Sequence, residues 1–281
     1  MQPSRCLSAL WPLALACAVA CTPAQGHDTW FSAQSGTRAG EWQLRLGTGD
    51  RFPHQTFTVP PAALKQQGCR QGQAAAVATQ PQRMTPTALL LKARLPAGAV
   101  RGNPSVVTCF AELQAVDIAI EPALVEVYLQ EIAAPAAVRA AWQAQQARGV
   151  PWQERYRKSA RVELRDPRLG GGDAPPAAPA PMAMDIVPER GPGAWQVGEE
   201  MRFQVLRDGQ PLAGQAIEAR SSLSPLGLWV RTDAQGRAAV RLPLPGAWLL
   251  RGTELRPSTQ RPDQWESDFV TLAFDVAPRP R

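Results

Sequence analysis

The chain has 281 residues, of which 44% are hydrophobic and 19% charged, and its formal net charge at pH 7 is +6. This length is enough for two domains with ordinary hydrophobic cores. The Lys and Arg residues form no dense block and are not interleaved with aromatic residues, so the composition does not indicate a nucleic-acid-binding protein.

The first 26 residues have the layout of a secretory signal peptide. Met1–Arg5 carries one positive charge, residues 7–20 form a short apolar run, and Ala24-Gln25-Gly26 offers small residues at a cleavage site. The apolar run is shorter than the ~20 residues of a spanning helix and contains a proline, so we predict cleavage and not a membrane span. Cleavage after Gly26 makes His27 the first mature residue and predicts a periplasmic protein.

A second processing route stays open at Cys21. Ala18-Val19-Ala20-Cys21 resembles a lipoprotein box, although alanine stands where such boxes usually carry leucine. Acylation of Cys21 would anchor the protein to a membrane and leave His27 internal.

The remaining cysteines predict one disulfide. Cys6, Cys17 and Cys21 fall in the signal region, which leaves Cys69 and Cys109 in the mature chain. Two cysteines in an oxidising compartment most simply pair with each other. A thiolate metal or redox site is the alternative, but the chain has no C-x-x-C spacing to favour it.

Residues 27–168 are predicted to form a β domain with a helical insertion. Alternating apolar and polar residues, such as Trp42, Leu44 and Leu46, indicate half-buried strands separated by Gly/Pro turns, as in a sandwich or open barrel. The predicted strands are 41–47, 57–59, 88–95, 105–113 and 115–120, with a returning strand from residue 156. Helical spacing predicts two helices within 122–149, the second ending at Gly149.

Residues 169–184 are rich in Gly, Pro and Ala and predict a linker. Residues 185–281 again read as short strands, with a hairpin turn at Asp208-Gly209. About seven short strands in this length favour an immunoglobulin-like or transthyretin-like sandwich. The predicted fold is therefore mainly β, with two β-sandwich-like domains.

Several short motifs are spread over nearly the whole mature chain. They are His27-Asp28-Thr29-Trp30, Tyr156-Arg157-Lys158-Ser159-Ala160, Gly209-Gln210-Pro211-Leu212-Ala213-Gly214, Thr232-Asp233-Ala234-Gln235-Gly236-Arg237-Ala238, Pro245-Gly246-Ala247-Trp248 and Trp265-Glu266-Ser267. In this set the chain resembles the domain-of-unknown-function family 4198, a periplasmic group related to nickel and cobalt uptake components. The resemblance implies a transition-metal cargo and an envelope transport system as partner.

The chain has only two histidines, His27 and His54. An N-terminal histidine offers two metal donors, its α-amine and its imidazole, and one more imidazole gives three nitrogens suited to Cu(II) or Ni(II). We therefore predict a metal site of His27, His54 and Asp28, with Glu121 as a less favoured fourth ligand. The alternative is that both histidines are ordinary surface residues that lie far apart.

Tyr156 and Lys158, flanked by Arg155 and Arg157, form a basic and aromatic stretch. Such a stretch can contact an anionic ligand, but it is more often an edge strand with solvated charges. Tyr156 and Lys158 are therefore candidate binding residues, with the edge strand as the alternative.

No catalytic motif is present: the sequence lacks a G-x-S-x-G elbow, an H-E-x-x-H helix and a phosphate loop. We therefore predict a non-enzymatic periplasmic accessory protein that binds Ni(II), Co(II) or Cu(II). The alternative is a β-sandwich binding or adhesion module of the cell envelope without metal. A remote third is a copper monooxygenase with a His27–His54 brace.

Overall fold

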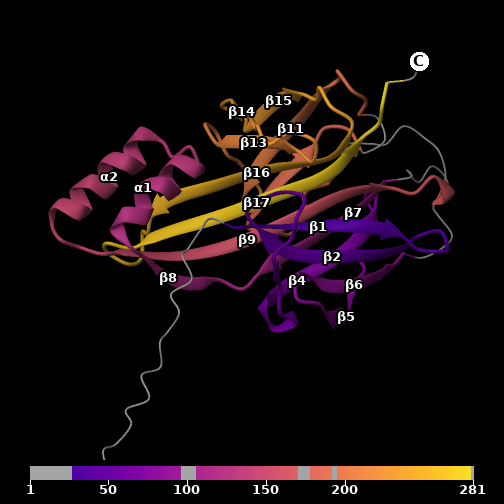
Figure 1. Cartoon of the computed structure of the whole chain (residues 1–281), viewed down its shortest axis with the longest axis horizontal. Coiled ribbons are helices and arrows are strands. Elements are labelled where there is room, and N and C mark those ends of the chain that lie inside the picture. Colours follow the sequence, from indigo (N-terminus) through magenta and orange to yellow (C-terminus); the bar gives the residue numbers. More distant parts are fainter. Residues whose placement is uncertain (1–26, 96–105, 170–177, 192–194, 280–281) are drawn as a thin grey trace, which may run out of the picture.

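The computed structural model describes residues 27–95, 106–169, 178–191 and 195–279. The predicted signal peptide, Cys21 within it and residues 170–177 of the predicted linker lie outside these ranges. The described residues are mainly β-strand with two short helices, which confirms the predicted fold class (Figure 1). None of the described helices is long and apolar enough to cross a membrane.

An eight-stranded sheet forms the middle of the molecule. Its order is β14 (Leu228–Arg231), β13 (Ala216–Ser221), β16 (Gly246–Pro257), β17 (Trp265–Val276), β9 (Trp152–Arg165), β7 (Val106–Leu113) and β4 (Leu64–Gln71), and β8 (Val116–Ile120) also pairs with β9. β17 and β9 run parallel, whereas the other pairs of this sheet are antiparallel. The parallel pair joins a strand from the middle of the sequence to the last described strand.

Two smaller sheets accompany the eight-stranded sheet. A five-stranded sheet has the order β1 (Asp28–Ser35), β2 (Glu41–Gly49), β6 (Leu89–Arg94) and β5 (Gln80–Met84), with β3 (Phe57–Thr58) paired to β2. A four-stranded sheet contains β10 (Met184–Pro188), β11 (Glu200–Arg207), β12 (Gln210–Pro211) and β15 (Arg237–Arg241).

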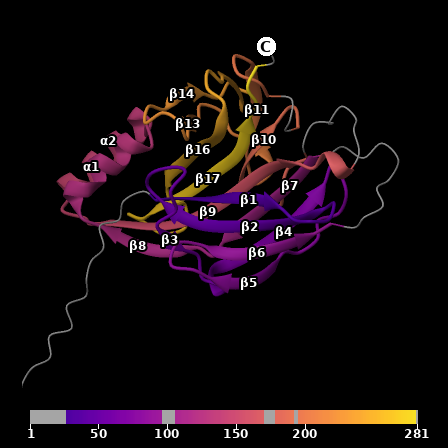
Figure 2. The same cartoon turned by 45° about the vertical axis from the view of Figure 1, so that its right-hand side comes forward.

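The two smaller sheets cover opposite faces of the eight-stranded sheet. On β17, Ala273 belongs to the core shared with the five-stranded sheet, whereas its neighbours Leu272 and Phe274 belong to the core shared with the four-stranded sheet. Successive side chains of a strand point to opposite faces, so these two cores lie on either side of β17. Figure 2 shows the resulting layers, with β9, β16 and β17 between the other two sheets.

The predicted helical insertion is present as α1 (Pro122–Glu131) and α2 (Ala136–Ala147). The two helices lie at one end of β9, β16 and β17 (Figure 1). Their buried residues share a core with Trp152 of β9 and with Trp265 and Phe269 of β17. Gly149 follows α2 with a φ of 71°, the left-handed conformation expected of a residue that ends a helix.

The segment 169–184 does not divide the sheets. β17, which follows this segment, hydrogen-bonds along β9, which precedes it, so the two predicted domains share the eight-stranded sheet. The last part of the segment is also packed, because Ala180 and Met182 are buried against Phe110 of β7. The composition predicted a linker over 169–184, and in its described last part the apolar side chains at these two positions bury surface against the sheet.

Two local predictions are confirmed. Asp208 and Gly209, with φ values of 48° and 76°, form the turn between β11 and β12. Cys69 of β4 and Cys109 of β7 lie directly opposite each other and form a disulfide.

Candidate functional site

His27 lies immediately before β1 and is half-buried. Its imidazole meets the ring of Phe57 edge-on, with 5.3 Å between the ring centroids. Its backbone carbonyl accepts a hydrogen bond of 2.7 Å from Nζ of Lys158. The residue is therefore fixed at both its side chain and its backbone.

The surroundings of His27 favour a neutral imidazole. Burial lowers the pKa of His27 below its ordinary value of 6.5, and the positive charge of Lys158 lowers it further. Asp50, Asp28 and Glu131 act in the opposite direction but do not reverse the shift. A neutral imidazole keeps a lone pair for a metal ion at neutral pH.

Lys158 reaches His27 from β9. Its Nζ lies 5.3 Å from the ring centroid of Tyr156 and 5.6 Å from that of Phe269, within the range of cation–π attraction. Burial lowers the pKa of Lys158 to about 8, and the nearby carboxylates of Asp28 and Glu154 offset part of this effect. Tyr156 is half-buried and its ring contacts that of Phe269, so the predicted pair Tyr156–Lys158 is brought to the His27 side of the sheet.

Asp28 is buried beside His27, but its carboxylate pairs with an arginine. Nη1 of Arg251 lies 3.0 Å from Oδ2 of Asp28, and Nε of the same arginine lies 2.6 Å from Glu218. Arg251 also donates a hydrogen bond of 2.9 Å to the carbonyl of Glu131 at the end of α1. Since this arginine neutralises Asp28, the carboxylate holds β1 to β16 and is a poor donor to a metal ion.

His54 lies in the loop between β2 and β3 and is exposed. Its backbone N–H donates to the carbonyl of Arg51 at 2.8 Å, which closes a tight turn. The following residue, Gln55, donates to the carbonyl of Trp30 in β1 at 2.8 Å and holds this loop against the strand that begins beside His27. The loop therefore approaches His27, although the ring that contacts the imidazole is that of Phe57 and not that of His54.

Of the two predicted carboxylate ligands, Asp28 lies beside His27 but pairs with Arg251, and Glu121 is not among the groups whose charge acts on His27. Glu121 precedes α1 and is exposed, whereas Glu131, at the other end of this helix, is the carboxylate whose charge acts on His27. Within the described part of the chain, no group of three or more His, Cys, Asp or Glu side chains is arranged to hold a metal ion. A metal site at His27 therefore depends on the α-amine that cleavage after Gly26 would create.

A buried hydrogen-bond network supports the aromatic side of the site. Glu154 of β9 accepts hydrogen bonds from Tyr128 at 3.0 Å, from the indole of Trp152 at 2.8 Å and from Ser267. Burial raises the pKa of Glu154 above its ordinary value, and it raises the pKa of Tyr128 well above 10.0. The ring of Tyr128 stacks on Phe269, so this network fixes the surface on which Lys158 rests.

Sequence patterns did not indicate Arg251, Phe57 or Phe269 as residues of the site. Arg251 occupies a buried position in a strand that was predicted from its apolar residues, and a charged residue at such a position signals a buried partner. Its partner Asp28 lies at a sequence separation of 223, so no local pattern indicates the pair.

No curated protein sequence matches this chain. Residues 24–253, which include His27, Lys158 and Arg251, match the family model described as Domain of unknown function (DUF4198). This match covers most of the chain and agrees with the resemblance seen in its motifs. The chain therefore belongs to the DUF4198 family.

Proposed function

We propose that this protein is a periplasmic carrier that binds a transition-metal ion through the α-amine and imidazole of His27. The observation that carries the proposal is the anchored, half-buried His27, whose imidazole is kept neutral and whose carbonyl is held by Lys158. Cleavage after Gly26 supplies the amine. The ion is cargo, and the carrier presents it to a transport system of the envelope.

The anchoring of His27 favours chelation because it fixes the donors before the ion arrives. The amine, the imidazole and the carbonyl belong to one residue, so the bond from Lys158 to the carbonyl also restricts the backbone next to the amine. A site ordered in advance loses less conformational freedom on binding. His54, on the loop that packs against β1, is the candidate for a third nitrogen.

The charges around His27 and the type of its donor atoms both affect which metal ion binds most tightly. The ammonium of Lys158 repels a cation, whereas Asp50 and Glu131 attract one. A set of two or three nitrogen donors suits tetragonal Cu(II) and Ni(II), and the usual order of affinities places Co(II) below both. We therefore expect Cu(II) to bind most tightly in vitro and Ni(II) to follow.

The test begins with protein purified from a periplasmic fraction. Intact-mass spectrometry is expected to show a chain that starts at His27, and calorimetric titration is expected to show one Cu(II) or Ni(II) per chain. Loss of a two-donor chelate in His27→Ala is expected to weaken binding about a hundredfold or more, against about tenfold in His54→Ala. A mass that starts at an acylated Cys21, or an unchanged affinity in His27→Ala, would contradict the proposal.

A second candidate function is a non-catalytic binding module without metal. It is favoured by a polar groove on the face of β9 opposite His27, lined by arginines. Under that function, blocking the α-amine of His27 is expected to leave ligand binding unchanged.

A further inference from the structure

Five basic side chains converge on a groove at the end of the eight-stranded sheet. Its volume is about 520 Å³, and its basic residues come from β4, β9, β16 and the loop between β16 and β17. These residues are Lys65, Arg155, Arg157, Arg256 and Arg261, and we call this cavity the arginine groove. It goes beyond the metal site proposed above, because Arg155 and Arg157 of its lining lie on the face of β9 opposite His27.

The alternation of β9 places the groove on the face opposite His27. Tyr156 and Lys158 point to the side of His27, so Arg155 and Arg157 point to the other. Further along the same face, Arg161 is fully buried and pairs with Asp185 of the four-stranded sheet at 2.7 Å. The groove thus occupies the part of this face that the four-stranded sheet leaves open.

The inner arginines of the groove are neutralised. Arg157 forms a two-point contact with Asp268, at 2.7 and 3.2 Å. Arg256 contacts Asp268 at 2.9 Å and Glu266 at 3.0 Å, and it also contacts Glu254. These pairs hold the wall of the groove in a fixed shape but leave little net charge.

The outer arginines carry an excess of positive charge. Arg155 lies 3.0 Å from one oxygen of Asp117, and Arg261 lies 3.5 Å from the other oxygen of the same carboxylate. The side chains of Arg155 and Arg261 are 43% and 52% exposed, so both guanidinium groups can be reached from solvent. Two positive charges therefore share one exposed negative charge at the mouth of the groove.

The rest of the lining is suited to hydrogen bonding. Gln114, Gln260 and Gln264 bring amide groups to the groove, and Lys65 adds an ammonium that is 48% exposed and pairs with Glu112 at 2.6 Å. Guanidinium groups bind the oxygens of carboxylates and phosphates in pairs, and amides bind hydroxyl groups. The lining thus combines oxyanion-binding cations with neutral donors and acceptors.

We propose that the arginine groove binds a small organic anion that carries at least two carboxylate or phosphate charges. The anion lies between Arg155 and Arg261 and displaces Asp117 as their partner. Binding replaces the two contacts that Asp117 makes with these arginines by two charge-assisted contacts to the anion, and the released Asp117 carboxylate is free to turn into solvent because its side chain is 57% exposed.

The test uses citrate and pyrophosphate as probes, titrated calorimetrically into metal-free protein at low and at physiological salt. Arg155→Gln and Arg261→Gln are each expected to weaken binding about tenfold, since each removes a charge-assisted contact. Asp117→Asn is expected to tighten binding about threefold, because it frees both arginines from a surface ion pair. Tighter binding of citrate identifies a carboxylate ligand, and tighter binding of pyrophosphate a phosphate ligand.

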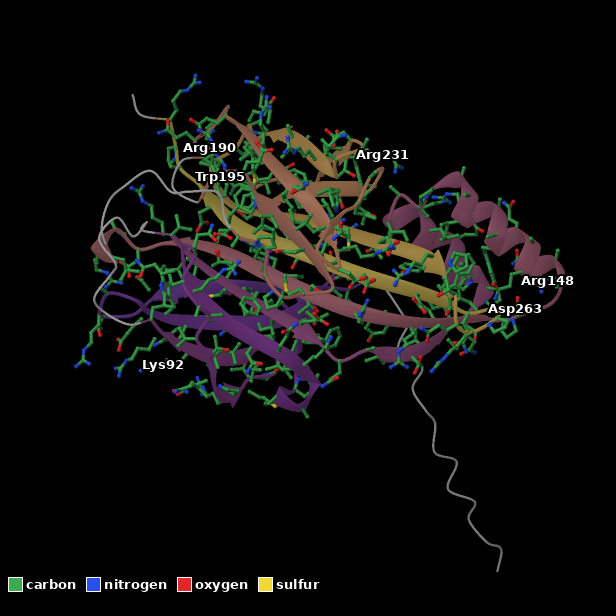
Figure 3. The ribbon with its side chains drawn as sticks, turned by 180° about the vertical axis from the view of Figure 1, so that it is seen from behind. Lys92, Arg148, Arg190, Trp195, Arg231 and Asp263 are labelled. Carbon is green, nitrogen blue, oxygen red and sulfur yellow. A yellow bond between two sulfur atoms is a disulfide. The ribbon has the colours of Figure 1, made fainter. Side chains whose placement is uncertain are left out.

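The control variant is Asp263→Asn, which changes the charge equally at an exposed ion pair outside the groove. Asp263 pairs with Arg148 at 2.5 Å beside the end of α2 (Figure 3). This variant is expected to bind both probes as the wild type does. Absence of binding by both probes, or equal affinities in wild type, Arg155→Gln and Asp117→Asn, would overturn the proposal. His27→Ala is expected to leave anion binding unchanged, so failure of this proposal and failure of the metal proposal are distinguishable.

Discussion

The two faces of β9 near its start contain very different environments. On one face, Tyr156 and Lys158 pack against aromatic rings and the backbone of His27. On the other face, Arg155 and Arg157 form ion pairs at the surface of the arginine groove. Four consecutive residues thus supply two separate sites, because alternate side chains of a strand face opposite ways.

This difference explains how one basic stretch can serve two chemistries. Water screens the exposed charges of Arg155, Arg261 and Asp117, so the ion pairs among them contribute little to stability and remain exchangeable. Charges near His27 are removed from water, so each needs a fixed partner. We expect mutations on the His27 face to affect folding strongly, and mutations on the groove face to affect binding.

The largest expected effect is that of Arg251→Met, on the His27 face. The substitution leaves the buried carboxylates of Asp28 and Glu218 without their shared cation. Breaking a buried ion pair in this way costs about 3–5 kcal/mol of unfolding free energy. Urea unfolding at pH 7 measures the loss.

The matched control is Arg155→Gln, which breaks the exposed pair with Asp117 and is expected to cost less than about 1 kcal/mol. Equal losses of unfolding free energy in Arg251→Met and Arg155→Gln would show that the ion pairs on the two faces contribute equally to stability.

The next largest expected effect is a pH dependence of the unfolding free energy that is caused by the burial of Lys158. Its pKa in the folded protein is about 8, below the ordinary value of 10.5. Between these values the unfolded chain binds more protons, so the stability contributed by this group rises with pH. The full cost of burying the ammonium is present below pH 8 and is lost by about pH 10.5.

Relative to Lys158→Met, the wild-type protein is therefore expected to gain up to roughly 3 kcal/mol of unfolding free energy between pH 8 and 10.5. Urea unfolding of both proteins at several pH values measures this difference. Parallel stability curves for wild type and variant would argue against a buried ammonium at this position.

The smallest expected effect is a change in the pKa of His27 itself. Phe57→Ala removes the ring that meets the imidazole edge-on, and so reduces the burial that lowers the pKa. The pKa of His27 is therefore expected to rise toward its ordinary value of 6.5. NMR titration of the imidazole signals measures the shift, and His54→Ala assigns them because the chain has only two histidines. A pKa of His27 that does not move in Phe57→Ala would mean that the ring does not shield the imidazole.

The sequence predicted the elements that have strong periodic patterns. Strands such as β2 and β11 alternate apolar and polar residues, and both helices follow the helical spacing of their apolar residues. Several of the described strands were not predicted, among them β1, β4 and β5. β5, with the sequence QPQRM, is exposed along its whole length, and β4 carries mostly polar residues, so neither has an apolar pattern to detect. β1 follows the predicted cleavage site directly and was interpreted only as a motif.

The candidate site was predictable only in part. The sequence indicated His27 because histidine is scarce in this chain, and it indicated Lys158 because of the motif around Tyr156. The contact between Lys158 and His27, however, joins residues with a sequence separation of 131. Such contacts are set by the order of strands in the sheet, which local patterns do not encode. The position of β9 beside β17, and the resulting position of Lys158 beside His27, required the structure.

The most direct test of the central proposal, a metal site at His27, is to block its α-amine. Protein that starts at His27 is acetylated once at the amine, the position is verified by peptide mapping, and Cu(II) affinity is compared with that of the unmodified protein. The proposal predicts a loss of about a hundredfold or more, because the chelate loses one of its two donors from the same residue. An acetylated protein that binds Cu(II) as tightly as the unmodified one would contradict it.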